Sequence, residues 1–285
     1  MAVGGVTLVE KTLERSYLKW ATALVCLFSL VYYPMISRVV QYWWYDPDYG
    51  HGFLIAPLAL FLVWQKRVLL MLIPITQDRV GFPVLISGLL LLLLGSLGRS
   101  EAFSQYSFPV VLSGLLLYLV GRRITAEVAF PIAFLIFMFP IPSSFYNRIT
   151  LPLKLLTSFA SATLIQLLEI PVYREGNILQ FANIDLEVAT ACSGIRSLIS
   201  LMALAGAIAY LTRCSAIKKI LLFLAAIPIA MAANIFRTTV TALLAHNYGP
   251  KMAEGFFHEF SGLVIFLFSI VTILILRAVL AERQK

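Results

Sequence analysis

The chain has 285 residues, of which 60% are hydrophobic and 13% charged, and it carries a formal net charge of +8. Because soluble globular proteins average about 25% charged residues, this composition excludes a soluble domain and indicates a protein almost entirely embedded in a membrane. The basic excess does not indicate nucleic-acid binding, since Lys and Arg are spread between apolar runs and form no patch.

The first apolar run is predicted to be a signal anchor. It covers Trp20–Ile36 and follows a polar leader that contains Lys11, Arg15 and Lys19. The run ends in "VYYPMI" and lacks the small-residue pattern of a cleavage site. We therefore expect this run to stay in the protein as its first membrane crossing.

The apolar runs predict an all-α polytopic membrane protein, because a membrane span needs about 17–25 mostly apolar residues. Eight runs are candidates, some of which must borrow flanking residues: Trp20–Ile36, Gly52–Trp64, Phe82–Leu97, Phe108–Val120, Ala126–Pro142, Gly194–Leu211, Ile217–His246 and Phe260–Leu280. No internal repeat or separate soluble domain is evident, so we expect about eight transmembrane helices in a single domain over residues 1–285.

The distribution of basic residues predicts the orientation. With the N-terminus inside and eight crossings, most of the 22 Lys and Arg residues fall on the inner face: Lys11, Arg15, Lys19, Lys66, Arg67, Arg79, Arg122, Arg123, Arg213, Lys218, Lys219, Arg277, Arg283 and Lys285. Cytoplasmic loops collect Lys and Arg. We therefore expect both termini in the cytoplasm and a multi-pass protein of the cytoplasmic (inner) membrane.

One further apolar segment, Thr150–Val172, is predicted to be an interfacial or re-entrant amphipathic helix on the outer side. A ninth crossing there would place Arg213–Lys219 outside and reverse the charge signal. Polar residues such as Lys154, Ser158 and Ser161 also give the segment an amphipathic pattern.

Cys192, in "ACSGIRSL", is the candidate nucleophile. Cys26 falls inside the first span and Cys214 in an inner loop, so only Cys192 faces outward, without a disulfide partner. Ser193 and Gly194 then open a helix whose N-terminal amides favour a thiolate. The alternative is a small residue that lets helices pack closely.

Two more polar groups are expected at the same depth. The helix from Ile217 starts inside and reaches the outer boundary at "ANIFRTT", where Asn234 and Arg237 share one face. An arginine inside a span usually faces a polar cavity or a partner, although it can also snorkel to the headgroups. His258 immediately precedes the last span, at the outer rim.

Cys192, Arg237 and His258 thus converge on one membrane face, an arrangement that suits thiol catalysis. A histidine takes the thiol proton and later delivers one to the leaving amine, and an arginine stabilises the oxyanion or the thiolate. His51 also lies on the outer side, and Arg196 follows Cys192 by one helical turn. His246 lies on the outer side too, at the end of the helix from Ile217, where it is expected to complement the helix dipole. Spacing alone does not choose among the three histidines or between the two arginines.

At these residues the sequence resembles the exosortases, bacterial polytopic membrane proteins that act like the soluble sortases without sharing their fold. Four ordered blocks between about residues 46 and 266 carry the resemblance: "DPDYGHGFLIAPLALFLVW", "ACSGIRSL", "PIAMAANIFRTTVTALL" and "GFFHEFSGLVIF". The resemblance implies a cysteine transpeptidase or protease with Cys192 as nucleophile, Arg237 as the functional arginine and His258 as acid/base.

The resemblance also implies the substrates, which are exported proteins with a C-terminal sorting signal. Such a signal joins a Pro-Glu-Pro-type motif, a transmembrane helix and a basic tail, and cleavage would give a thioester before transfer to an unknown acceptor or to water. The sequence departs from the family pattern at Thr190, where many members have Glu. Glu187 and Asp185 lie further upstream, so the acidic partner of His258 is unassigned.

Other function classes stay open at this point. A transporter or polysaccharide-export component would use Arg237 and His258 to line a path, but transporter sites usually lie at the bilayer midplane. A membrane thiol acyltransferase would carry an acyl group on Cys192. A zinc site from Cys192 and histidines lacks ligand spacing, so we expect no metal and no cofactor. The expected partners are sorting signals and membrane lipids.

Overall fold

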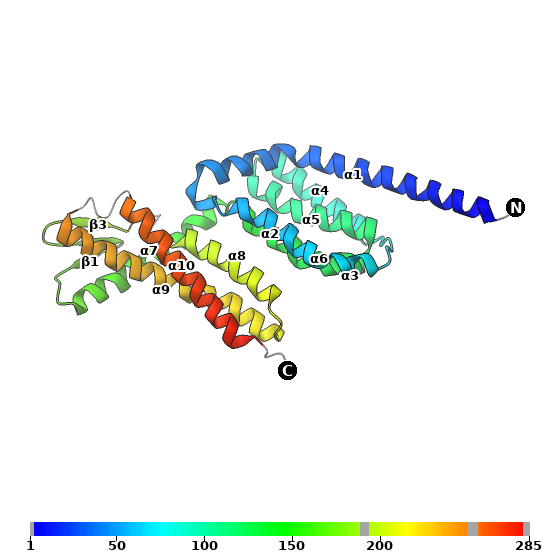
Figure 1. Ribbon diagram of the computed structural model, residues 1–285. Coiled ribbons are helices and arrows are strands. Elements are labelled where there is room, and N and C mark those ends of the chain that lie inside the picture. Colours follow the sequence, from blue (N-terminus) through cyan, green and yellow to red (C-terminus); the bar gives the residue numbers. More distant parts are fainter. Residues whose placement is uncertain (1–2, 189–193, 250–255, 282–285) are drawn as a thin grey trace. The chain divides into compact units, whose positions relative to one another are not determined.

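The computed structural model describes residues 3–188, 194–249 and 256–281. The chain forms two compact units, Met1–Pro140 and Ile141–Lys285, and each is described by itself (Figure 1). The first unit holds α1 (Val3–Tyr45), the 3-10 helix η1 (Pro47–Tyr49), α2 (Gly52–Gln65), α3 (Arg67–Leu72), α4 (Gly81–Leu97), α5 (Glu101–Val120), α6 (Arg122–Phe134) and the 3-10 helix η2 (Leu135–Met138). Helix α1 continues nine residues past the expected end of the first span at Ile36.

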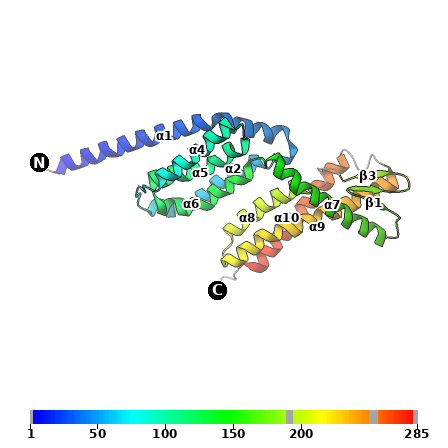
Figure 2. The ribbon, with the colours of Figure 1, turned by 180° about the vertical axis from the view of Figure 1, so that it is seen from behind.

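The tightest pair in this unit is the antiparallel hairpin of α4 and α5, which run side by side in Figures 1 and 2. Gly81, Gly88 and Gly95 are spaced seven residues apart on α4 and are all buried. A Cβ atom at Gly88 would lie 2.6 Å from Cγ2 of Val111 and 2.9 Å from its amide nitrogen. Small residues at such spacing let membrane helices approach at backbone distance.

The block "DPDYGHGF" builds the bend between α1 and α2. Asp46 caps η1 by accepting a hydrogen bond from the Asp48 amide at 2.9 Å. Gly52 is required because a Cβ there would overlap the indole ring of Trp43. The Trp43 indole in turn donates to the Met138 carbonyl at 2.8 Å, which ties α1 to η2. This block therefore has a structural role within the first unit.

The second unit holds α7 (Ser143–Leu167), β1 (Tyr173–Glu175), β2 (Ile178–Gln180), β3 (Asp185–Glu187), α8 (Ile195–Leu211), α9 (Ala216–Tyr248) and α10 (Phe256–Leu280). Helices α8, α9 and α10 pack side by side (Figure 2). Alanines four residues apart line their contact, Ala205 with Ala209 on α8 and Ala226 with Ala230 on α9. These small side chains bring the three helices close together.

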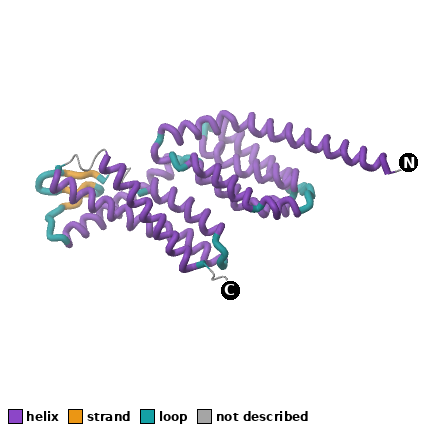
Figure 3. Tube along the Cα trace, viewed as in Figure 1, coloured by secondary structure: helices purple, strands orange, loops and turns teal. Residues whose placement is uncertain are grey.

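A small antiparallel sheet, which the all-α expectation did not include, lies between α7 and α8 in the chain. Its order is β1-β2-β3, and Figure 3 shows the strands in orange beside the C-terminal half of α9. Gly176 has φ +60°, and Glu175 pairs with Ile178, so a two-residue Gly-Asn turn joins β1 to β2. Leu179 packs against Ile165 of α7 and Ala242 of α9 in one buried cluster.

In the middle of helix α7 several hydroxyl side chains are buried while neighbouring large apolar ones are exposed. Thr157, Ser158 and Ser161 are buried, whereas Leu156 and Phe159 are exposed. The Ser158 hydroxyl donates to the Gly176 carbonyl at 2.9 Å. Part of the polar pattern therefore packs against protein, and the interfacial position of this helix stays a prediction.

Length and hydropathy qualify five of the described helices as candidate membrane spans: Thr22–Tyr45, Glu101–Val120, Ser143–Leu167, Ala216–Tyr248 and Phe260–Leu280. Helices α4 and α8 are apolar but have 17 residues each. At 1.5 Å per residue, the 14 residues of α2 reach about 21 Å, which is short of a 30 Å hydrocarbon core. The chain is therefore a largely helical, multi-pass membrane protein, and the count of eight crossings stays a prediction.

Candidate functional site

Asn234 is the centre of a buried hydrogen-bond relay in the second unit. It lies on α9 with 3% of its surface exposed. Its Oδ1 accepts from the Arg237 guanidinium at 3.1 Å, and its Nδ2 donates to the Thr157 hydroxyl of α7 at 3.2 Å. Because a guanidinium only donates, this geometry fixes which way the Asn234 amide is oriented. The prediction that Asn234 and Arg237 share a face is confirmed.

The Arg237 guanidinium reaches from α9 to α10. A Cβ atom at Gly262 would lie only 3.2 Å from Nη1 of Arg237, so the guanidinium packs directly on the α10 backbone. The side chain is half-buried and is held on one side by Asn234. A planar charged group fixed in this way is suited to binding an anion or a developing oxyanion.

Gly194 brings the start of α8 to the same place. It is the N-cap residue of α8, is buried, and has φ +79°, which is left-handed backbone that favours glycine. A Cβ there would lie 2.9 Å from Cγ of Asn234. Both the backbone and the packing therefore require glycine, and the positive end of the α8 dipole is placed beside the Asn234 amide.

The site lies just over halfway along α9. Asn234 lies 18 residues after Ala216, the first residue of α9. That separation corresponds to about 27 Å of helix, close to the thickness of a hydrocarbon core. The 33-residue helix then continues and packs against the small sheet through Ala242.

The predicted site residues divide into three groups. Cys192 and Ser193 lie outside the described residues, and His258 lies in α10 but its side chain is not described. Gly194, Asn234 and Arg237 are brought together. Arg196 is exposed on α8, and Glu187 is exposed on β3, where it accepts from Asn177 at 3.2 Å.

Two of the three histidines have structural partners. His51 belongs to the first unit, where its Nε2 donates to the Phe137 carbonyl at 3.1 Å. Burial lowers the pKa of His51 below its ordinary value, so the ring is neutral at pH 7. His246 bonds Asn183 through Nδ1 at 2.8 Å and stacks on Phe181. The Nε2 bond ties His51 to η2 within the first unit, while its Nδ1 is buried without a partner among the described residues.

Sequence reasoning missed three residues that build the site. Thr157 supports Asn234 from α7, Gly262 makes room for Arg237 on α10, and Thr238 buries a hydroxyl that has no hydrogen-bond partner among the described residues. The sequence does contain a local sign of two of these residues, which is helical spacing from a candidate residue. Gly262 follows His258 by four residues and Thr238 follows Asn234 by four, so each pair shares a helix face. Within the described ranges no group of His, Cys, Asp and Glu could hold a metal ion.

Comparison with known proteins supplies the family. The family model described as transmembrane exosortase matches residues 43–275. Neither the curated proteins nor the solved structures contain a match to the chain. The matched range takes in the α1–α2 bend, the α8 start, the Asn234–Arg237 relay and most of α10. The chain belongs to the transmembrane exosortase family, whose members are membrane-embedded sorting transpeptidases.

Proposed function

We propose that this protein is a cysteine transpeptidase or protease that cleaves the C-terminal sorting signal of exported proteins through a thioester on Cys192. Arg237 stabilises the oxyanion, and His258 is the acid/base. The observation that carries the proposal is the Arg237 guanidinium, which is fixed by Asn234 and packs on Gly262. Arg237 contacts α10, which bears His258, and its partner Asn234 contacts Gly194, two residues after Cys192.

Chain length limits the distance of Cys192 from the relay. Cys192 precedes Gly194 by two residues, and an extended chain spans at most about 3.6 Å per residue, so their Cα atoms lie within about 7 Å. Gly194 itself touches Asn234. On the other side, Val188 is buried, and its amide donates to the Asn177 carbonyl at 2.8 Å. Both ends of the segment that carries Cys192 are therefore anchored.

The register of α10 sets the distance of His258. It precedes Gly262 by four residues, which is one helical turn or about 6 Å along the axis, on the same face. Since Arg237 packs at Gly262, a substrate carbonyl held by Arg237 is within reach of an imidazole at position 258. Asn234 and Thr157 are positioning residues on this proposal, because they act through Arg237.

The proposed reaction has two steps. The Cys192 thiolate attacks the scissile carbonyl carbon while His258 holds the thiol proton, and the oxyanion lies against Arg237. The C–N bond breaks as the imidazolium gives its proton to the leaving amine, which leaves a thioester on Cys192. An acceptor nucleophile or water then attacks the thioester, gives its proton to His258 and regenerates the thiol.

We further propose that the site faces the exterior of the cytoplasmic membrane and that both termini are cytoplasmic. The charge distribution and the depth of Asn234 along α9 support this orientation. A membrane-impermeant maleimide applied to intact cells should label Cys192 and spare Cys214, which lies between α8 and α9. Labelling of Cys214 without Cys192 would reverse the orientation.

The decisive experiment co-expresses the full chain with a reporter that ends in a Pro-Glu-Pro-type motif, a transmembrane helix and a basic tail. Cys192→Ala and His258→Gln should insert normally and accumulate uncleaved reporter. His246→Gln is the matched control, because His246 is already occupied by Asn183 and Phe181, and it should cleave normally. A thioester between Cys192 and the reporter, seen by mass after acid quench, would be direct support.

The same experiment separates the other function classes. Normal cleavage by Cys192→Ala would end the peptidase proposal and favour a transporter or export component. An acyl group on Cys192 that does not derive from the reporter would favour a thiol acyltransferase.

A further inference from the structure

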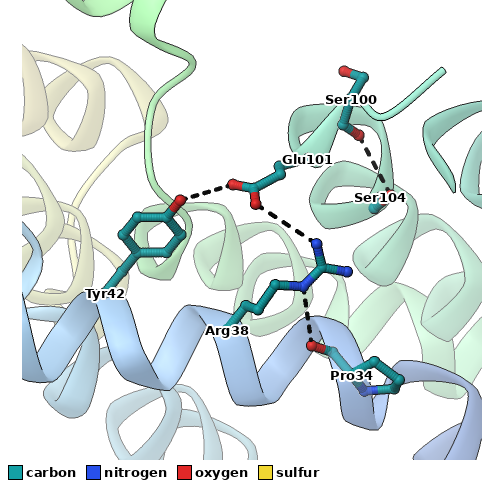
Figure 4. A network of polar contacts seen from close by, with 6 residues as sticks. All are labelled: Pro34, Arg38, Tyr42, Ser100, Glu101 and Ser104. Atoms are coloured by element: carbon teal, nitrogen blue, oxygen red, sulfur yellow. Dashed lines mark hydrogen bonds and ion pairs between the residues drawn. The ribbon is translucent and has the colours of Figure 1, made fainter.

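The first unit contains a polar pocket of about 580 Å³ among α1, α4 and α5, which the proposed peptidase chemistry does not use. Its rim carries two arginines, Arg38 and Arg99. Arg38 lies 3.6 Å from Glu101 and donates from Nε to the Pro34 carbonyl at 3.3 Å, as Figure 4 shows. Arg99 is exposed and makes no hydrogen bond or ion pair with the part of the chain that the structure describes. Two arginines and one glutamate therefore give the pocket a net charge of about +1.

A buried amide in the pocket lacks a partner. Gln105 lines the pocket with only 4% of its surface exposed, and it makes no hydrogen bond to a described residue. The residue is buried, but its amide still reaches the space of the pocket, where a group of a ligand can bond to it. Gln105 lies one helical turn below Glu101 on α5, so the unmet donor and acceptor are deeper in the pocket than the arginines.

Below the amide the walls become apolar. Val31 and Leu92 line the pocket about two turns below Glu101. The register is fixed by Tyr32, whose hydroxyl bonds the Ser107 hydroxyl at 2.8 Å. One candidate span begins at Glu101 and another ends at Tyr45, so Arg99 lies just outside the first and Arg38 lies two helical turns from the end of the second. Val31 is two further turns inside that second span.

We infer that this pocket binds a glycerophospholipid. The phosphodiester lies against Arg38 and Arg99 at the rim, an ester carbonyl of the glycerol backbone accepts from the Gln105 amide, and the acyl chains run along Val31 and Leu92. Charge-assisted bonds from guanidinium to phosphate are among the stronger hydrogen bonds in proteins. The pocket lining changes from charged at the arginines, through the Gln105 amide, to apolar at Val31 and Leu92, which matches an amphiphilic ligand. A soluble anion would contact only the arginines. This inference does not depend on the proposed peptidase activity.

The test uses the purified, delipidated full chain and measures bound ligand by native mass spectrometry. The probes are palmitoyl-oleoyl phosphatidylglycerol, glycerol 3-phosphate and inorganic phosphate. We expect saturable binding of the lipid and at least tenfold weaker binding of both soluble phosphates. Arg99→Gln should weaken lipid binding about fivefold to tenfold, and Gln105→Leu should weaken it while keeping the side-chain volume.

Arg148→Gln is the matched control, because Arg148 is an exposed arginine of α7 and lies outside the pocket. It should bind lipid as the unmodified protein does. Equal loss of lipid in Arg148→Gln and Arg99→Gln would mean general attraction to the headgroup layer and would overturn the inference. Binding of inorganic phosphate as tight as that of the lipid would also overturn it, since the pocket would then be a free-anion site. Unchanged lipid binding in both pocket variants would do the same.

Discussion

Replacing Gly194 by alanine tests the geometry on which the site depends. The new Cβ would lie 2.9 Å from Cγ of Asn234, so the Asn234 side chain must move. That movement breaks or lengthens the bonds that Asn234 makes to Thr157 at 3.2 Å and to Arg237 at 3.1 Å. The alanine also occupies left-handed backbone, at φ +79°.

The magnitude follows from these two effects. Left-handed backbone costs an L-residue about 1–2 kcal/mol, and a buried polar group left unpaired costs about 1–3 kcal/mol. We therefore expect Gly194→Ala to lower the free energy of unfolding by roughly 2–5 kcal/mol. Gly176→Ala is the matched control, because Gly176 also has positive φ, at +60°, whereas a Cβ atom there would meet no described atom within 4 Å. It should cost only about 1–2 kcal/mol.

The assay combines unfolding of the purified protein in mild detergent with reporter cleavage in cells. Gly194→Ala should lower cleavage at least tenfold, and Gly176→Ala should leave it unchanged. In an Asn234→Ala background the 2.9 Å contact with Cγ is gone and only the 3.0 Å contact with Cβ is left. Gly194→Ala should therefore cost at least about 0.5 kcal/mol less there than in the unmodified protein, which a double-mutant cycle measures. Equal effects of the two glycine substitutions on stability and on cleavage would refute the reasoning.

Three further predictions rest on single described contacts. Arg237→Lys should lower reporter cleavage about 100- to 1000-fold at unchanged expression, because an ammonium group cannot both bond Asn234 and pack flat on α10 as the guanidinium does. Cleavage within a factor of about three of that by the unmodified protein would contradict this prediction. Burial lowers the pKa of His51 in the folded protein, so below about pH 6.5 the unfolded chain binds a proton there more readily than the folded protein does. The free energy of unfolding should therefore be highest above about pH 6.5 and should fall as the pH drops below that value. That decline should be weaker in His51→Gln, and identical pH profiles would count against it. Gly88→Leu should separate α4 from α5 and lower thermal stability, whereas Ser87→Leu, at an exposed neighbour, should not; equal melting temperatures would show that the close approach is dispensable.

Hydropathy and helical spacing predicted the long helices and the Asn234–Arg237 pair, because both depend on residues close in sequence. The end of α1 was predicted too early. The apolar run ends at Ile36, whereas α1 continues to Tyr45 through Arg38, which lies 3.6 Å from Glu101. A distant partner of this kind cannot be read from local composition.

The small sheet and the polarity of α7 could not be predicted for related reasons. Strands of three residues are too short to show alternation, and the only local signal was the Gly176–Asn177 turn. In α7 the buried Ser158 and Ser161 gave the amphipathic pattern that usually marks a surface helix. Their partners are the Gly176 and Ile235 carbonyls, far along the chain, so the pattern reports packing against protein.

The four family-like blocks fall into two kinds when they are placed on the structure. The block around His51 lies in the first unit, where its residues have structural roles. Asp46 caps η1, Gly52 makes room for Trp43, and His51 donates to the Phe137 carbonyl. The other three blocks contribute Gly194, Asn234 with Arg237, and the helix that bears His258 to the second unit. A neutral, half-buried His51 that already donates to a carbonyl is a poor general base, because its lowered pKa weakens its hold on a proton. His51 is therefore the weaker candidate for the base, and His258 stays the proposed acid/base.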